Sequence, residues 1–493
     1  MFDVGCSMFD VQSFHCSGQA EFHAGCSIAP ANSVITTDHR LRTTENMPLR
    51  DIPHILLINP WIHDFAAYDF WAKPMGLLTI ASMLRHHGIR VSYIDCLDRF
   101  HPHAPKTDPH ARYGRGPYFK TRIPKPFGLN DVPRYFSRYG IKPQWFKEDL
   151  LKLDQPDLVL ITSLMTYWYP GVQETIEIIR SVFPQTPIVL GGIYARLCHE
   201  HARNNSGADH VADGSAEKNL FSLVRRFTGF SVTPSFEPEV LDSYPYPSLD
   251  LQTRLNYVPL LTSRGCPFRC AYCASRFLEP KRLLRSPEAV IEEIAYWEKS
   301  YGLSDFVLYD DAFLVETEQH AIPILEEIRR TGIKVRFHTP NAIHIRGIDA
   351  QTARLMFEAG FTTLRLGLET ADFDHRREID MKVSGDEFKR AVSCLKETGF
   401  KKNQVGAYLL VGLPDQNLDT TKHSIDIVKQ IGITPIAAYY TPIPHTALWP
   451  KAVAASRYDL ESDPVFTNNA VLPCQKQPFN WETISHLKEL INK

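Results

Sequence analysis

The chain has 493 residues, a formal net charge of −2 and a hydrophobic content of 44%. This length exceeds what one ordinary core holds, and the near-neutral charge excludes a bulk electrostatic attraction to nucleic acid or membranes. No apolar run reaches the roughly 18 residues of a membrane span, and no secretion signal opens the chain. We therefore expect a cytoplasmic protein of two or more domains. Its ten cysteines are then reduced thiols or metal ligands rather than disulfides.

Residues 1–46 differ in composition from the rest of the chain. They are rich in Ser, Thr, His and Asn, show no sustained helix or strand period, and repeat the pair Cys-Ser at Cys6, Cys16 and Cys26. The spacing of these cysteines matches no metal-ligand pattern. The segment is therefore predicted to be a disordered leader, or alternatively a misassigned start before Met47.

Residues 47–236 alternate between buried strands and amphipathic helices, apart from one long insertion. This alternation predicts an α/β domain with a doubly wound, Rossmann-like parallel sheet, whose ligands bind beyond the carboxyl ends of its strands. The expected strands are 54–60, 91–96, 157–163 and 187–192, and the expected helices are 75–88 and 171–183.

The insertion covers residues 97–156 and is dense in Pro, Arg, His and Tyr. A connection of this length usually serves a function or is disordered, and its aromatic content argues against plain disorder. We expect a partly ordered flap over the rim of the sheet or over the mouth of the next domain. The alternative is an RNA-binding strip, because basic and aromatic residues interleave here.

The second half of the chain resumes the alternation after a proline-rich linker at 237–252. Residues 253–450 contain six strand–helix units, which fit an incomplete TIM-like (β/α)6 barrel better than a flat sheet. The expected strands are 258–263, 305–310, 334–339, 363–369, 404–412 and 435–441. Residues 451–493 form a tail that ends in an amphipathic helix, predicted to dock on the barrel.

Three cysteines follow the first barrel strand at the rim where barrel enzymes carry their chemistry, namely Cys266, Cys270 and Cys273. A zinc site needs a fourth ligand, and none lies nearby in the sequence. A 4Fe–4S cluster held by three thiolates keeps one iron open for a substrate or cofactor. Three unrelated structural cysteines would not gather within eight residues between Gly and Pro.

The pattern Cys266-x-x-x-Cys270-x-Tyr272-Cys273 resembles the signature of radical S-adenosylmethionine (SAM) enzymes. The resemblance implies that the three cysteines hold a 4Fe–4S cluster whose open iron binds SAM. One electron from the cluster then cleaves SAM and yields a 5′-deoxyadenosyl radical. It also implies a reductant such as flavodoxin or ferredoxin and contacts from Tyr272 to the cofactor.

The resemblance continues in order along the barrel. It implies further SAM contacts just beyond the second to fifth strands, where the sequence reads YDDAF, TPNAIHI, RLGLETAD and LVGLPDQ. The residues singled out are Asp310, Asp311, Asn341, Glu369, Thr370 and Gly412. The Gly-Gly-Glu that many members carry after the second strand is replaced by the two aspartates, as in the cobalamin-associated branch.

Residues 47–236 resemble the cobalamin-binding domain that precedes many of these barrels. The Asp-x-His-x-x-Gly motif of base-off cobalamin proteins is absent, so the domain binds either cobalamin or part of the substrate. With cobalamin, the expected reaction is methylation or rearrangement of a small molecule. The alternatives are a radical RNA-modifying enzyme, or a zinc or iron–sulfur binding module without turnover.

Overall fold

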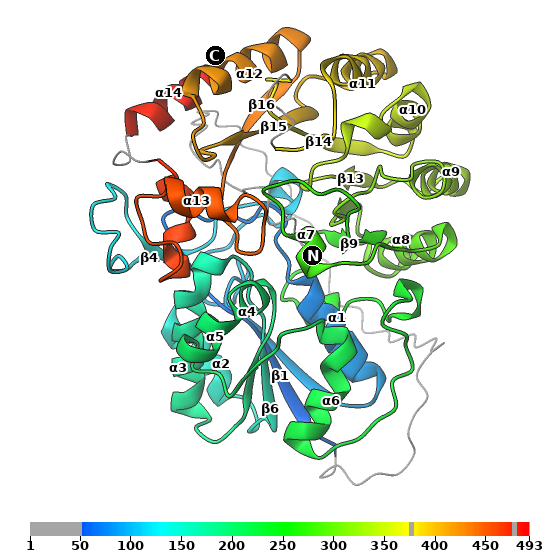
Figure 1. Cartoon of the computed structure of the whole chain (residues 1–493). Coiled ribbons are helices and arrows are strands. Elements are labelled where there is room, and N and C mark those ends of the chain that lie inside the picture. The colour runs from blue at the N-terminus through cyan, green and yellow to red at the C-terminus, as the bar shows by residue number, and fades with distance from the viewer. Residues whose placement is uncertain (1–51, 374–378, 476–480, 493) are drawn as a thin grey trace, which may run out of the picture.

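The computed structural model describes residues 52–373, 379–475 and 481–492 (Figure 1), so the predicted leader at 1–46 lies outside the described residues. Two parallel sheets dominate these ranges, and no helix within them is long and apolar enough to cross a membrane. The expected α/β class with a Rossmann-like domain and a partial barrel is confirmed. The boundaries assigned to the domains stay predictions.

The first sheet is five-stranded, parallel and ordered β3-β1-β6-β7-β8. Its strands are β1 (His54–Asn59), β3 (Arg90–Asp95), β6 (Leu158–Ile161), β7 (Ile188–Leu190) and β8 (His210–Val211). Its main helices are α1 (Met75–His86), α2 (Pro143–Leu151), α3 (Tyr169–Val182) and α6 (Ala216–Thr228), with the short α4 (Ile193–Leu197) and α5 (His199–Asn205).

Strand β1 shows why the sheet is covered on both faces. Ile55 and Leu57 pack with α1 and α6, whereas Leu56 and Ile58 pack with α2 and α3. Successive side chains of a strand point to opposite faces, so a continuously apolar strand needs a helix layer on each side. Figure 1 shows α1 and α6 on one side of this sheet and α2 and α3 on the other.

The second sheet is the partial barrel, six-stranded and parallel in the order β16-β15-β14-β13-β12-β9. Its strands are β9 (Val258–Leu260), β12 (Asp305–Leu308), β13 (Arg336–His338), β14 (Phe361–Glu369), β15 (Val405–Val411) and β16 (Thr434–Tyr439). The outer helices are α8 (Pro287–Tyr301), α9 (Ala321–Thr331), α10 (Ala350–Glu358), α11 (Gly385–Thr398) and α12 (Leu418–Ile431).

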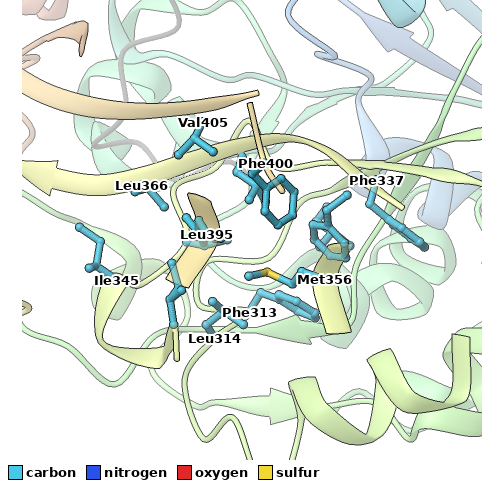
Figure 2. Packing of buried hydrophobic residues seen from close by; sticks show 14 of the residues in the cluster. Phe313, Leu314, Phe337, Ile345, Met356, Leu366, Leu395, Phe400 and Val405 are labelled. Atoms are coloured by element: carbon cyan, nitrogen blue, oxygen red, sulfur yellow. The ribbon is translucent and has the colours of Figure 1, made fainter. Parts of the chain in front are cut away.

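The barrel core lies between the strands and the outer helices. Figure 2 shows Phe337, Leu366 and Val405 from three neighbouring strands facing Met356 of α10 and Leu395 of α11. Because alternate strand residues point the other way, Arg365 and His338 face the lumen.

The first barrel strand is shorter than predicted. β9 ends at Leu260, and Ser263 and Arg264 form β10 (Ser263–Arg264), which pairs antiparallel with β11 (Leu283–Leu284). The chain leaves the barrel here because Thr262 N donates to Asp310 Oδ2 at 3.1 Å instead of extending the ladder. The hydroxyls of Thr262 and Ser263 donate to the same carboxylate.

The insertion at 97–156 is ordered and contains secondary structure. Strands β4 (Lys120–Arg122) and β5 (Ser137–Tyr139) join β2 (Ile62–Asp64) in an antiparallel sheet, and α2 packs on α3. The turn at Ala111–Gly114 contacts the barrel, because Asn256 Nδ2 donates to Gly114 O at 2.9 Å.

The C-terminal tail ties the two halves of the molecule together. Asn468 Nδ2 donates to the buried carboxylate of Asp64 at 2.9 Å, and Asn469 Nδ2 reaches Tyr439 O of the barrel at 3.4 Å. Helix α14 (Trp481–Asn492) buries Ile484 and Leu487 in the barrel core. The prediction that this helix docks on the barrel is confirmed.

Candidate active site

The cysteine loop opens onto a small cavity at the carboxyl end of the barrel. The three sulfur-bearing residues line about 410 Å³ of space together with Asp311, His344 and Lys382. Among the described residues the cysteines are free of disulfides, and no further cysteine lines this cavity. No group of three or more His, Cys, Asp or Glu side chains in the described ranges gathers closely enough for a single metal ion. Three thiols around an open space fit an iron–sulfur cluster better than a zinc ion.

Glycine is required immediately before the first cysteine. Gly265 has a φ of +82°, and a Cβ at this position would lie 2.4 Å from Lys281 O. Asp311 Oδ2 accepts a hydrogen bond from Gly265 N at 3.2 Å. The tight turn therefore places Cys266 over the barrel and beside Asp311.

The two neighbouring aspartates have different surroundings. Asp310 accepts hydrogen bonds from Thr262 N at 3.1 Å, Thr262 Oγ1 at 2.6 Å and Ser263 Oγ at 2.6 Å. It anchors the strand that leads into the cysteine loop, whereas Asp311 lines the cavity itself. Asn341 supports the same region, since its Nδ2 donates to Tyr309 O at 3.2 Å and to Asp310 O at 3.4 Å.

Lys382 joins two of the predicted site residues. Its Nζ donates to Tyr272 Oη at 2.9 Å and lies 3.5 Å from Glu369 Oε1. Glu369 is buried with a φ of +61°, at an irregularity in the pairing of β14 with β15. Left-handed backbone at a glutamate is strained, and such strain concentrates at functional sites.

Burial in the cavity wall shifts the pKa values of two of its side chains. Burial raises the pKa of the Cys270 thiol to about 12, and the charge of Lys382 opposes that rise. Burial lowers the pKa of His344 well below its usual value, so this imidazole is neutral. Its ring stacks on Phe268 with centroids 4.8 Å apart, and its Nε2 lies 4.0 Å from Cys266 Sγ.

Of the predicted cofactor contacts, Asp311 alone lines the cavity. Thr370 and Gly412 have hydrogen-bond partners on other parts of the barrel. Thr370 Oγ1 is 3.5 Å from Ser424 Oγ of α12 and accepts a hydrogen bond from Asp372 N. Gly412 has a φ of +89°, and its N donates to Gln416 Oε1 at 2.7 Å. The structure thus brings Asp311, Tyr272 and Glu369 close to the cysteines. The cofactor contacts assigned to the seven residues from the sequence stay predictions.

A second, larger cavity lies where the Rossmann-like sheet meets the barrel. It encloses about 1530 Å³ up to its mouth and reaches the carboxyl ends of β1, β6 and β7 at Asn59, Thr162 and Gly192. Gly192 has a φ of +91°, and a Cβ there would lie 2.2 Å from Ser163 O. On its other side, the cavity is lined by the barrel residues Leu261, Arg264 and Tyr309.

A buried ion pair joins the two halves of the molecule at this cavity. Arg264, two residues before Cys266, lies 2.8 Å from Glu217 at the start of α6, and both side chains line the cavity. Burial alone would raise the pKa of Glu217, but Arg264 and the hydroxyl of Ser215 lower it below its usual value. The ion pair therefore connects the cysteine loop to the Rossmann-like domain.

Comparison with known families settles the nature of the barrel. Residues 260–428 match the model of the Radical SAM superfamily, and this range includes all three cysteines. This part of the chain is a radical SAM domain. Membership makes the protein an enzyme and implies a 4Fe–4S cluster and SAM as cofactors, as the cysteine spacing predicts. The alternative of a binding module without turnover is not favoured.

Relatives of this radical SAM enzyme include methyltransferases and cyclases. An uncharacterized methyltransferase of Pyrococcus horikoshii is 25% identical over 333 residues, which cover 62% of this chain and 71% of that one. The anaerobic magnesium-protoporphyrin IX monomethyl ester cyclase of Rubrivivax gelatinosus is 23% identical, over 60% and 58% of the two chains. The radical SAM methyltransferase TsrM of Kitasatospora setae, solved with cobalamin and a [4Fe-4S] cluster, has a TM-score of 0.60 at 16% identity. That match covers 82% of this chain and 75% of TsrM, and it shows a shared fold.

Sequence reasoning missed three residues of the site in this radical SAM enzyme. Lys382 and His344 line the cysteine cavity, and Arg264 lines the larger one. Lys382 lies more than a hundred residues after the cysteines and outside the motifs that follow the barrel strands. Nothing in the sequence around Lys382 therefore indicates that this residue belongs to the site. His344 falls within the quoted TPNAIHI segment, and its position after the third strand was the available signal.

Proposed function

We propose that this radical SAM enzyme methylates an unactivated carbon of a small-molecule substrate, with cobalamin in the larger cavity. The single observation that carries the proposal is the position of that cavity, which lies between the Rossmann-like rim and the barrel rim beside the cysteine loop. When bound, cobalamin supplies a carrier for the methyl group, while the cluster supplies the electron that cleaves SAM.

The walls of the larger cavity fit a corrinoid. The cavity extends from the carboxyl ends of the Rossmann-like strands to the rim of the barrel, so one ligand there would contact both halves of the molecule. The lining is mainly apolar, with Trp61, Leu77 and Trp168 among its residues. Thr162 and Ser163 would hold the polar edge of the cofactor, and Gly192 leaves backbone exposed for a close approach.

The smaller cavity supports specific roles for its residues. Cys266, Cys270 and Cys273 would ligate the cluster and leave one iron for SAM. Asp311 lines the space where the polar groups of SAM would lie. Lys382 positions Glu369 and Tyr272 at its edge, and Asp310 and Asn341 hold the backbone that carries the loop.

A small-molecule substrate is favoured over RNA by the placement of the insertion. Trp71 Nε1 donates to Tyr113 O, and Arg115 stacks 4.4 Å from the Trp71 ring, so this part of the insertion turns into the barrel rather than outward.

The proposal includes a cytoplasmic location and a flavodoxin or ferredoxin as the electron donor.

A ring-forming rearrangement is the second candidate reaction. It is favoured by the cyclase of Rubrivivax gelatinosus, whose similarity to this chain is nearly as high as that of the methyltransferase relative. Anaerobic reconstitution with iron, sulfide and hydroxocobalamin separates the two reactions. Methylation converts SAM to S-adenosylhomocysteine as well as 5′-deoxyadenosine, whereas a rearrangement yields no S-adenosylhomocysteine.

Filling the larger cavity should block cobalamin binding without unfolding the protein. Gly76 lines the cavity on α1, and a Cβ there meets nothing within 4 Å. Gly76→Trp should weaken hydroxocobalamin binding by about tenfold or more, because the indole occupies the space of the ligand. Absorbance titration of the corrinoid measures this effect.

Gly76→Ala is the matched control, because it also removes a glycine from the helix but adds only a methyl group. This variant should bind hydroxocobalamin as the wild type does. Unchanged corrinoid binding by a folded Gly76→Trp variant would exclude this cavity as the cobalamin site.

A further inference from the structure

Two side chains in the cysteine cavity come from other parts of the barrel. His344 follows β13 and Lys382 precedes α11, whereas the three cysteines lie on the loop after β10. Both side chains line the same cavity of about 410 Å³ as the cysteines. Neither belongs to the cysteine pattern, so the cavity holds more polar groups than cluster ligation needs.

Lys382 places a buried positive charge beside the cysteine loop. Its side chain is only 12% exposed. Nζ donates to Tyr272 Oη at 2.9 Å and lies 5.3 Å from the centroid of that ring. Tyr272 stands between Cys270 and Cys273 in the sequence, so this contact fixes the ammonium next to two of the sulfur ligands. The charge of Lys382 also opposes the effect of burial on the pKa of Cys270, in agreement with this position.

His344 faces the first cysteine of the loop. Its side chain is buried, and Nε2 lies 4.0 Å from Cys266 Sγ, within reach of a weak hydrogen bond to sulfur. Phe268 stacks on the ring with an interplanar angle of 17°, which fixes the direction of this nitrogen. Nδ1 is buried without a hydrogen-bond partner among the described residues. A neutral imidazole keeps its proton on the nitrogen that has an acceptor, so we assign the proton to Nε2.

The carboxylates around the cavity give these two groups an electrostatic effect. Asp311 lines the cavity, and the buried Glu369 lies 3.5 Å from Lys382 Nζ. Reduction adds an electron to a cluster that thiolates and carboxylates surround with negative charge, so repulsion opposes this step. A nearby cation and a hydrogen bond to a ligand sulfur stabilise the reduced cluster more than the oxidised one, because the reduced cluster is more negative.

We propose that Lys382 and His344 raise the reduction potential of the 4Fe–4S cluster, Lys382 through its charge and His344 through a hydrogen bond to the thiolate of Cys266. In this step a reduced flavodoxin or ferredoxin loses one electron and the cluster gains it, while no proton or leaving group moves. The inference rests on the cluster ligation proposed above. It holds for methylation and for rearrangement alike, because both begin with this electron.

Redox titration of the anaerobically reconstituted full-length protein, followed by the electron paramagnetic resonance signal of the reduced cluster, tests the inference. Lys382→Met removes the cation and leaves Glu369 uncompensated. This variant should lower the equilibrium constant for one-electron reduction about tenfold or more, which is a shift of about 59 mV toward negative potential. His344→Phe keeps a ring that can stack on Phe268 but removes the N–H, so it should cause a smaller shift in the same direction.

Conservative variants should recover the potential of the wild type in part. Lys382→Arg keeps the positive charge and His344→Gln keeps an N–H donor, so each should have a less negative midpoint than Lys382→Met or His344→Phe respectively. Glu369→Gln removes the opposite charge and should shift the midpoint to less negative values than the wild type.

The matched control is Lys396→Met. Lys396 lies exposed on α11, outside the cavity, and its Nζ donates to Ile431 O at 3.1 Å. The variant removes the same charge from the same barrel and should keep the midpoint potential of the wild type. Iron content and thermal melting of every variant show how much cluster and fold it retains.

A purely structural role of Lys382 and His344 predicts a different result. Their variants would then lose iron or melt at lower temperature, whereas the cluster that they retain would have the potential of the wild type. That outcome overturns the inference even where SAM is still cleaved. If Lys382→Met retains no cluster, the directions of the shifts in His344→Phe and Glu369→Gln decide it. A wild type that assembles no 4Fe–4S cluster would instead contradict the proposed ligation, and the inference with it.

Discussion

A Cys270→Ser variant purified without oxygen should lack the brown absorbance of an iron–sulfur cluster and should form no 5′-deoxyadenosine from SAM. The three cysteines share one cavity, and no further cysteine lines it in the described part of the chain. Loss of one thiolate leaves two protein ligands, which is too few to retain a 4Fe–4S cluster that already lacks a fourth. Iron and sulfide content, the visible spectrum and chromatography of the SAM products measure the effect.

Cys394→Ser is the matched control for this experiment. Cys394 lies on α11, outside the cavity, and is half-buried. This variant should keep the colour, the iron content and the SAM cleavage of the wild type. A wild-type protein that binds a single zinc ion and no iron would contradict the cluster assignment, as would full SAM cleavage by Cys270→Ser.

Glu217→Ala should lower the free energy of unfolding by about 3–5 kcal/mol, because it leaves Arg264 buried without its carboxylate. The same change should loosen the turn before Cys266 and reduce iron retention. Replacing both partners by apolar residues, Glu217→Leu with Arg264→Met, should restore most of the stability, since no buried charge remains. Urea denaturation of Glu217→Leu, Arg264→Met and the double variant forms the double-mutant cycle.

The exposed pair next along α6 provides the control for Glu217. Lys218 Nζ lies 3.1 Å from Glu239 Oε1, with both side chains about half exposed, so Lys218→Ala should cost less than about 1 kcal/mol of stability.

The Glu217 ion pair should also make the stability depend on pH. Because the pKa of Glu217 is held below its usual 4.5, its contribution to the free energy of unfolding is present above pH 4.5. It is lost as the pH falls through the lower folded value. Wild-type stability that does not fall in this acid range would count against the ion pair.

Local sequence signals defined most of the elements because each depends on neighbours in the chain. The continuous apolar run at 54–60 predicts β1. Ser286 caps α8 through a hydrogen bond from Ala289 N, and Pro287 follows it, a pair that is typical of a helix start. Asp349 forms a capping box with Thr352 at the start of α10. The first barrel strand was predicted too long because the bonds of Thr262 and Ser263 to Asp310 span about fifty residues.

The sequence by itself determined the chemistry of this protein, because three thiols within eight residues form one loop whatever the rest of the chain does. It also determined the α/β class and the six barrel strands, which follow from periodicity and local turns. The tertiary structure alone decided which distant groups meet: Lys382 with Tyr272 and Glu369, and Arg264 with Glu217. These contacts depend on how strands from separate segments are placed side by side, and no local pattern records that placement.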